Sequence, residues 1–461
     1  MSAIKALITR LSQGLRASVY NNADNKEVLA SAGLIFVAKV LFAFIGFVVS
    51  IVITRYLTVA EAGYYFFMLG ALAMLSTLSR VGLDNAIVRF TAVANDRGDY
   101  LQLKRILSLS ISLALGGAAI ISFVLWLAYL FEFPIFFTSL HRDSLLWMLC
   151  IIPVTSVTVV LVQSFQGLKR MGYYAGFNGL IRPLNLLALA LILLFTGGLS
   201  IAQALWIYFA VALGVLVLAY VCWQRVLAGM STLVTKRESV SAEPAAVAAL
   251  PLSGFKGEFY SYSFSLWGIA CLAIVMGQGA QVLLGFLSSV EQVAYFSVAN
   301  RIALLVSFVL LAINGILSPK FAEISAQNDV LRLQQLYRAS TRLMILLTSP
   351  FLLLIFIFSP EILLLFGSDY QQAATVLRIL IAAQFVKVAV GSVGQLLIMA
   401  NLQRSQRNNL IMSVVILISL SLYLMPMYGA LGAAIACFVA ITCNNVMGLF
   451  QVYKKLNIRV F

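Results

Sequence analysis

Charged residues make up only 10% of this 461-residue chain, and their scarcity is the first constraint on what it can be. With 62% hydrophobic residues beside them, they leave too little polar surface for a water-soluble protein of this size. Apolar runs long enough to cross a bilayer recur along the whole length. The sequence therefore predicts an all-α membrane protein with many spans.

Residues that build metal sites, catalytic triads and nucleotide sites are also nearly missing. The chain has one histidine, His141, and five cysteines without CxxC-type spacing, so the usual metal clusters and disulfide frameworks are excluded. No G-x-x-x-x-G-K-[ST] sequence occurs, which excludes a P-loop for ATP. We predict no catalytic residue, no metal and no cofactor. An enzyme is further disfavoured because the longest outward loop, 131–143, has only thirteen residues.

Apolar runs separated by charged or Pro/Gly-containing segments predict twelve membrane-spanning helices. The segment before them, 1–29, alternates polar and apolar residues and predicts an amphipathic helix on the membrane surface rather than a cleaved signal. The predicted spans are 30–53, 63–83, 103–130, 144–165, 173–196, 199–222, 259–285, 292–318, 343–359, 371–399, 409–427 and 429–453.

Lysine and arginine are distributed unevenly, with 23 of the 31 on the side of the membrane that holds both predicted termini. Cytoplasmic loops carry the positive excess, so both termini are expected in the cytoplasm. The net charge of +15 therefore reflects topology and does not indicate nucleic-acid binding. We expect an N-terminal segment 1–29, a six-helix bundle 30–222, a cytoplasmic linker 223–258, a second six-helix bundle 259–453 and a cytoplasmic tail 454–461.

Apart from Lys104 and Arg105 at the inner end of the span 103–130, six cations lie inside the predicted spans without any Asp or Glu in the same spans. A charge in hydrocarbon costs at least about 2.5 kcal/mol even on the mildest scale. Unpaired charges of one sign therefore predict a polar cavity for an anion. These cations are Lys39, Arg80, Arg182, Arg301, Arg378 and Lys387.

The chain also repeats itself. The segment 56–66 aligns with 286–296, which begins 230 residues later, with Glu61 and Glu291, then Tyr65 and Tyr295, in register. Each segment joins the first two helices of a predicted six-helix half. Because six helices return the chain to the same side, the repeats are expected to be parallel, related by an axis along the membrane normal.

The segments TRYLTVAEAGY (54–64) and GLDNAIVRF (82–90), with the repeat at 291–296, resemble Wzx-type polysaccharide flippases of the multidrug/oligosaccharidyl-lipid/polysaccharide exporter superfamily. The resemblance covers the whole chain in helix number and pseudo-symmetry. It implies a V-shaped pair of bundles in the bacterial cytoplasmic membrane, which carries an undecaprenyl-diphosphate-linked oligosaccharide to the outer leaflet through a cationic lumen. Membrane lipids, a polysaccharide polymerase and a chain-length regulator are the other partners implied, and a monomer is expected.

Helical periodicity divides the buried cations. Lys39, Arg182, Arg301 and Lys387 lie deep in their spans on polar or small-residue stripes and are predicted to bind the substrate. Arg80 is near a span end, where reaching the membrane interface or pairing with Asp84 is an equal alternative to binding the substrate. The other candidate lumen residues are Asn178, Asn185, Gln278, Gln281, Asn300, Gln384 and Gln395.

Three interpretations accompany this assignment. Arg378 lies about 180° from Lys387 around their helix, so we expect it to reach lipid headgroups or the exit rather than the cavity. For Gln278 and Gln281, hydrogen bonding between helices is an equal alternative to sugar binding. Tyrosines at predicted helix ends, Tyr65 among them, are interpreted as an interfacial belt.

Two other transport functions stay open at this point. A peptidoglycan-precursor flippase of the same superfamily would use similar cations. A multidrug exporter for cationic drugs is disfavoured, because it would place acidic residues in its cavity. No intramembrane carboxylate or histidine is available for proton transfer, so the membrane potential, or a weak counter-ion at rim acids such as Glu61 or Asp84, is predicted to drive the cycle.

Overall fold

Helices account for almost all of the chain in the computed structural model, which describes residues 23–131, 142–238, 252–327 and 329–458. No strand occurs in these ranges, and the predicted all-α fold is confirmed. The first half consists of α2 (Ala23–Tyr56), α3 (Val59–Ser79), α4 (Leu83–Asp96), α5 (Tyr100–Leu130), α7 (Arg142–Gly167), α8 (Met171–Phe177), α9 (Ile181–Thr196) and α10 (Ile201–Glu238).

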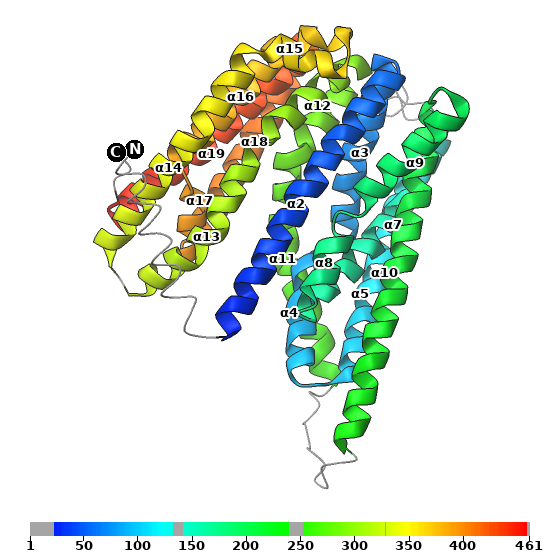
Figure 1. Ribbon diagram of the computed structural model, residues 1–461, viewed down its shortest axis with the longest axis vertical. Coiled ribbons are helices and arrows are strands. Elements are labelled where there is room, and N and C mark those ends of the chain that lie inside the picture. The colour runs from blue at the N-terminus through cyan, green and yellow to red at the C-terminus, as the bar shows by residue number, and fades with distance from the viewer. Residues whose placement is uncertain (1–22, 132–141, 239–251, 328, 459–461) are drawn as a thin grey trace.

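The second half repeats the pattern of long helices, with two of its spans broken into shorter pieces (Figure 1). Its elements are α11 (Leu252–Leu287), α12 (Val290–Leu304), α13 (Ser307–Ala326), α14 (Val330–Ile357), α15 (Ser359–Leu363), η1 (Leu364–Phe366), η2 (Ser368–Ala373), α16 (Ala374–Val390), α17 (Val393–Met399), α18 (Gln403–Tyr428) and α19 (Ala430–Leu456).

Eleven helical segments among the described residues are long and apolar enough to cross a membrane. The predicted twelfth, 292–318, is divided between α12 and α13, which meet at Leu305 and Val306. The predicted span 173–196 is likewise interrupted, at 178–180, and Pro183 follows inside α9. Proline is harmless at its actual position in the first turn of α9, where no N–H partner is required.

Two predicted segments differ in their bounds from the structure, and one helix was not predicted. Residues 1–22 lie outside the described residues, while 23–29 of the predicted surface segment belong to α2. The predicted linker 223–258 is helical at both ends, because α10 continues to Glu238 and α11 begins at Leu252. Between α3 and α5 the chain forms α4, an amphipathic helix that the search for long apolar runs did not predict.

The repeated segments form the contact between the halves. Thr58 caps α3 through a capping box with Glu61, and Ser289 occupies the matching N-cap of α12. The two helices approach closely at Gly63, where a Cβ atom would collide with the carbonyl group of Val290. Only a residue without a side chain permits this contact. The second helices of both halves therefore pack against each other.

The first helix of the second half also packs on the first half. Ser263 of α11 donates a hydrogen bond to the carbonyl oxygen of Val81 (2.7 Å), and Phe259 packs edge-on against Phe90 of α4. α11 also lies against α18 of the second half. It therefore contacts both halves of the molecule.

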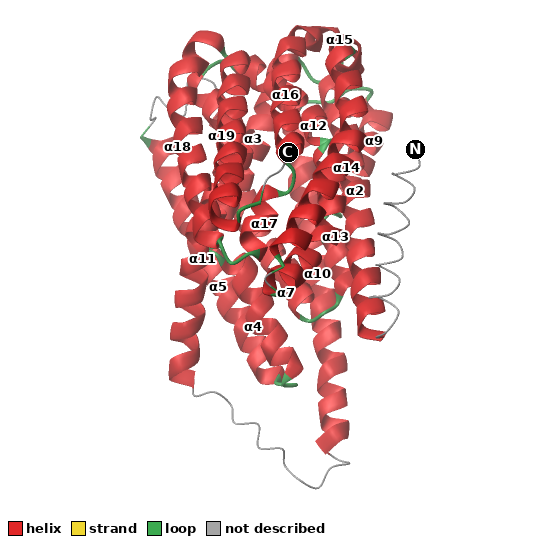
Figure 2. Cartoon of the chain, turned by 90° about the vertical axis from the view of Figure 1, so that its left-hand side faces the viewer, coloured by secondary structure: helices red, strands yellow, loops and turns green. Residues whose placement is uncertain are grey.

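The two halves come together around α15 and diverge toward α4 (Figure 1). We call these ends of the molecule the α15 end and the α4 end. Figure 2 shows the second half from outside, with α14 on one flank, α18 and α19 on the other, and α16 and α17 between them. This V shape is the arrangement that the sequence resemblance implies.

Candidate functional site

A cavity of about 460 Å³ lies between the two halves, with walls from α2, α3, α9, α10 and α12. A smaller cavity of about 290 Å³ adjoins it and shares Ala43, Asn178, Gly179, Arg182 and Phe308 with it. We call the two together the cationic cavity. Three of the predicted cations line it, Lys39, Arg182 and Arg301, and none of its lining residues is an Asp or Glu.

Arg301 brings a charge from the second half into contact with the first. Its guanidinium donates a hydrogen bond to the hydroxyl oxygen of Ser50 on α2 and lies 4.4 Å from the centre of the Phe66 ring on α3. Neither partner is charged. A cation over an aromatic face is held in place without being neutralised, so its charge stays available to an anion.

Arg182 and Lys39 supply the charge from the first half. Arg182 lies across α2 at Gly46, where a Cβ atom would be 3.1 Å from its Cδ atom. Both side chains are exposed, and neither has an ion-pair partner among the described residues. Two arginines and a lysine without carboxylates form a site suited to a phosphate or diphosphate, which the arginines can bind through two parallel hydrogen bonds.

The break between α8 and α9 gives this wall its shape. Gly179 lies so close to α2 that a Cβ atom there would overlap the ring of Phe42. Asn178 and Gly179 line both parts of the cavity, and Arg182 follows within one turn. The predicted site residue Asn178 is exposed toward this space. The helix break therefore lets a polar turn and a cation face the cavity together.

Asn185 and two tyrosines form the polar wall beside Arg301. The Nδ2 atom of Asn185 donates to the Tyr65 hydroxyl at 3.3 Å, while its buried Oδ1 atom has no hydrogen-bond partner among the described residues. Tyr208 of α10 also lines the cavity. A buried acceptor without a partner is unfavourable unless a ligand or water donates to it.

The interpretation of Tyr65 as part of an interfacial belt is wrong, because its side chain is buried at the cavity wall. Its register with Tyr295 in the repeat was visible in the sequence, but repeats do not reveal which helix face meets a neighbour. Tyr208 was not predicted at all, since a single tyrosine in an apolar span carries no local signal.

Arg80 lies away from the cationic cavity and has a carboxylate partner. Its Nε and Nη2 atoms bind the two oxygens of Asp84 at 2.6 and 3.0 Å, and Nη1 donates to the carbonyl oxygen of Ser76 at 2.8 Å. Of the alternatives that the sequence left open, the structure shows the ion pair. The rim acids are thus occupied, Asp84 by Arg80 and Glu61 by its own helix cap.

The candidate residues of the second half, other than Arg301, do not line the cationic cavity. Lys387 is half-buried on α16 and has no hydrogen-bond or ion-pair partner among the described residues. Gln384, one turn earlier, accepts a hydrogen bond from Ser307 at 3.4 Å. The remaining candidates, Asn300 on α12 and Gln395 on α17, are half-buried.

The glutamines of α11 divide into two cases. The amide nitrogen of Gln281 donates a hydrogen bond to the carbonyl oxygen of Phe66. Of the two roles considered for Gln281, sugar binding and hydrogen bonding between helices, the structure shows the second. Gln278 is half-buried one turn away and does not line the cationic cavity. Gln281 therefore joins α11 to α3 across the two halves.

The sequence matches a known protein family. The sequence model described as "Polysaccharide biosynthesis protein" matches residues 28–325, more than half of the chain. Stage V sporulation protein B of Bacillus subtilis (strain 168) is 27% identical over 152 residues, which are 32% of this chain and 29% of that protein. The match thus spans less than a third of the relative.

Two solved structures share the fold over nearly their whole length. One is the inward-facing conformation of a multidrug resistance MATE family transporter of the MOP superfamily, with a TM-score of 0.68, 13% identity, and coverage of 91% of this chain and 94% of the other. The second is the lipid II flippase MurJ in an inward closed conformation, with a TM-score of 0.66, 12% identity, and coverage of 91% and 87%.

Proposed function

Because the chain belongs to the polysaccharide biosynthesis protein family, we propose that it flips undecaprenyl-diphosphate-linked oligosaccharides from the inner to the outer leaflet of the bacterial cytoplasmic membrane. One observation carries the proposal: Lys39, Arg182 and Arg301 line one cavity between the halves in which no acidic residue takes part. Such a site attracts an anion and repels the cationic drugs of a multidrug exporter.

The residues around the cations suit the two parts of this substrate. Arg182 and Arg301 would replace the water around the diphosphate with charge-assisted hydrogen bonds. The free acceptor of Asn185 and the nearby tyrosines would bind sugar hydroxyls. The prenyl chain would stay in the bilayer. Lys387 is proposed to join the substrate from the second half in another conformation of the cycle.

Transport would proceed by alternating access, with the two halves rocking around the cationic cavity. The excess of lysine and arginine at the loops of the α4 end supports an orientation with this end, and both termini, in the cytoplasm. The flipped lipid would then pass to a polymerase and a chain-length regulator in the outer leaflet, with the flippase acting as a monomer.

A second candidate is a flippase for the peptidoglycan precursor. It is favoured by the structural similarity to the lipid II flippase MurJ. Its substrate is also a sugar on a prenyl diphosphate, so the cationic cavity serves both proposals equally. The lipid-linked intermediate that accumulates distinguishes them.

The decisive experiment is to delete the gene in its host and identify the accumulated lipid-linked intermediate by mass spectrometry. Complementation with Arg182→Ala or Arg301→Ala should restore less than a tenth of export at normal protein abundance, since each removes a charge-assisted contact of about 1.5–3 kcal/mol. Arg97→Ala, which removes an exposed cation outside the cavity, serves as the matched control. Full export by both cavity variants would refute the assignment.

A further inference from the structure

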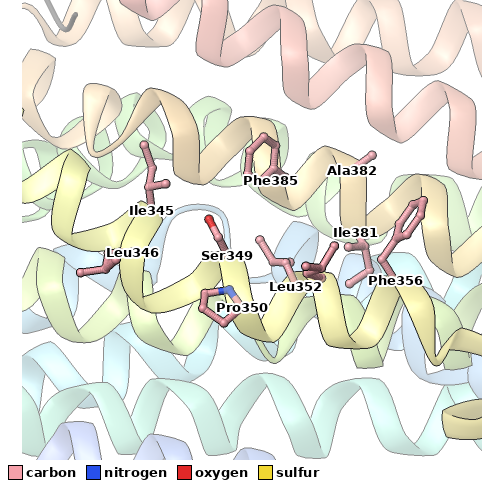
Figure 3. A pocket seen from close by; sticks show the side chains of 10 residues that line it. Ile345, Leu346, Ser349, Pro350, Leu352, Phe356, Ile381, Ala382 and Phe385 are labelled. Carbon is pink, nitrogen blue, oxygen red and sulfur yellow. The ribbon is translucent and has the colours of Figure 1, made fainter.

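A second cavity, of about 660 Å³, lies on the outside of the second half, between α14 and α16 (Figure 3). It shares no lining residue with the cationic cavity. We call it the α14–α16 groove. Its walls are Ile345, Leu346, Ser349, Pro350, Leu352, Leu353 and Phe356 of α14, with Ile381, Ala382 and Phe385 of α16.

The groove results from two local features of the sequence. Pro350 lies inside α14, where it lacks the N–H that would bond to the carbonyl group of Leu346 and its ring disturbs the preceding turn. Ala382 faces this region from α16 with a single methyl group (Figure 3). A disturbed helix opposite a small side chain leaves space that a larger residue would fill.

The side chains around the groove are those of a site that binds a hydrocarbon chain. Both of its helices belong to candidate membrane spans, 330–357 and 368–390, and α14 forms a flank of the second half (Figure 2). Leu353 and Phe385 are 58% and 46% exposed, as expected for side chains that face lipid. Ser349 is the one side chain of the ten with a hydrogen-bonding group. Water needs two to four polar partners, so an apolar chain is the better occupant.

A cation stands at the α15 end of the groove. Arg378 precedes Ala382 by four residues and Phe385 by seven, so the three share one face of α16. Its Nε atom donates to the carbonyl oxygen of Phe356 at 3.3 Å, and its guanidinium lies 5.9 Å from the centre of that ring. Among the described residues Arg378 has no carboxylate partner.

The groove is separate from the proposed transport path. Lys387 lies about 170° around α16 from the face formed by Arg378, Ala382 and Phe385, at 100° per residue. Arg378 and Lys387 therefore lie on opposite faces of α16 and cannot bind the same ligand. An apolar slot that faces the bilayer and ends in a guanidinium without a carboxylate partner among the described residues matches a lipid with a hydrocarbon chain and an anionic headgroup.

We propose that the α14–α16 groove binds one acyl chain of an anionic membrane phospholipid, whose headgroup phosphate pairs with Arg378. The occupant is a bulk lipid rather than the translocated one, because the groove has no wall in common with the cationic cavity. The proposal rests on the membrane-spanning fold and holds whatever the transported substrate is.

The test is native mass spectrometry of the purified protein titrated with phosphatidylglycerol or with phosphatidylcholine of the same acyl chains. Arg378→Gln should weaken phosphatidylglycerol binding about fivefold, since a basic side chain near anionic lipid contributes about 1 kcal/mol. Binding of the zwitterionic lipid should not change. Ala382→Phe should abolish tight binding of both lipids by filling the groove.

The matched control is Leu354→Phe, which adds a similar ring on α14 at a 51% exposed position outside the groove. Equal affinity of wild type and Arg378→Gln for phosphatidylglycerol would overturn the proposal, and so would unchanged binding in Ala382→Phe. Displacement of phosphatidylglycerol by an equimolar polyprenyl phosphate would assign the groove to the transported lipid instead and overturn the commitment to a phospholipid. If Ala382→Phe does not fold, the comparison of wild type with Arg378→Gln still tests the proposal.

Discussion

The Nη2 atom of Arg55, near the end of α2, donates a hydrogen bond to the carbonyl oxygen of Leu364 at 2.7 Å, and its Nε atom donates to the next carbonyl, that of Leu365, at 2.9 Å. Two turns earlier on α2, the ring of Phe47 meets Phe366 edge-on at a centroid distance of 5.2 Å. These contacts tie the first helix of one half to η1 of the other. They hold the halves together at the α15 end.

Replacing Arg55 with Gln should weaken this closure. Both hydrogen bonds are exposed, so we expect a loss of about 1 kcal/mol and a roughly fivefold rise in the population open at the α15 end. Spin labels at Tyr56→Cys and Ser368→Cys, in a background without the five native cysteines, would report it as a longer distance. Arg55→Lys should behave much as Gln, since an ammonium cannot reproduce the two-pronged geometry. An unchanged distance distribution in Arg55→Gln would show that the contact does not control closure.

Two neighbouring glycines, Gly176 inside α8 and Gly179 in the break that follows it, should respond differently to alanine. Gly179→Ala forces a Cβ atom into the ring of Phe42 and should destabilise the fold by about 1–3 kcal/mol through overpacking. Gly176→Ala, three residues earlier, meets nothing within 4 Å and should be neutral or slightly stabilising. Thermal unfolding in detergent measures both. Equal melting temperatures for the two variants would contradict the close approach of Gly179 to Phe42 of α2.

The pair Arg80–Asp84 should act on stability and leave transport selectivity alone. Arg80→Ala strands a partly buried carboxylate and should cost about 1–3 kcal/mol. Asp84→Ala should cost a similar amount, and the double variant less than the sum, since the two residues act as one unit. A thermodynamic cycle from melting curves measures the coupling. Additive costs would mean that the two side chains stabilise the fold independently and that their ion pair contributes nothing.

The hydroxyl of Tyr65 should matter for the substrate more than for the fold. Tyr65→Phe keeps the buried ring and removes the acceptor that Asn185 uses at 3.3 Å. We expect a several-fold loss of export. The free energy of unfolding should fall by no more than about 1 kcal/mol, and the melting temperature should change accordingly little. Tyr64→Phe, at the neighbouring buried tyrosine that does not line the cavity, is the comparison variant. Equal export by the two would remove Tyr65 from the site.

The membrane potential should drive the cycle if an anion moves outward through a cationic carrier. A potential negative inside contributes about 2.3 kcal/mol per charge per 100 mV. Collapsing it at constant ion gradients in reconstituted vesicles should therefore slow flipping about tenfold or more. An unchanged rate would instead favour coupling to an ion, a role for which Glu61 and Asp84 are poorly placed because both have protein partners.

The sequence predicted best what depends on composition along a single helix. Lys39, Arg182 and Arg301 were found because a charge inside an apolar run is costly wherever the run packs. Lys387 has the same signal, yet it does not line the cationic cavity. Depth in the bilayer follows from counting residues. The direction in which a helix face points depends on its neighbours.

The features that the sequence did not reveal arise from contacts between helices. The break at Gly179 depends on the ring of Phe42, more than 130 residues earlier in the chain, and no local pattern predicts it. α4 was missed because it is amphipathic and short, so a search for long apolar runs passes over it. Gln281 could be assigned to a hydrogen bond between helices only once Phe66 was seen beside it.

The position of α11 has a consequence for how the protein is made in the membrane. Its residues Ser263 and Phe259 pack on Val81 and Phe90, so faces of α3 and α4 stay uncovered until α11 has been inserted. A nascent chain that ends after α10 therefore lacks part of its own interior. We therefore expect that a split of the gene after α11 yields fragments that reassemble better than a split before it, because the first fragment then carries the helix that covers this part of α3 and α4.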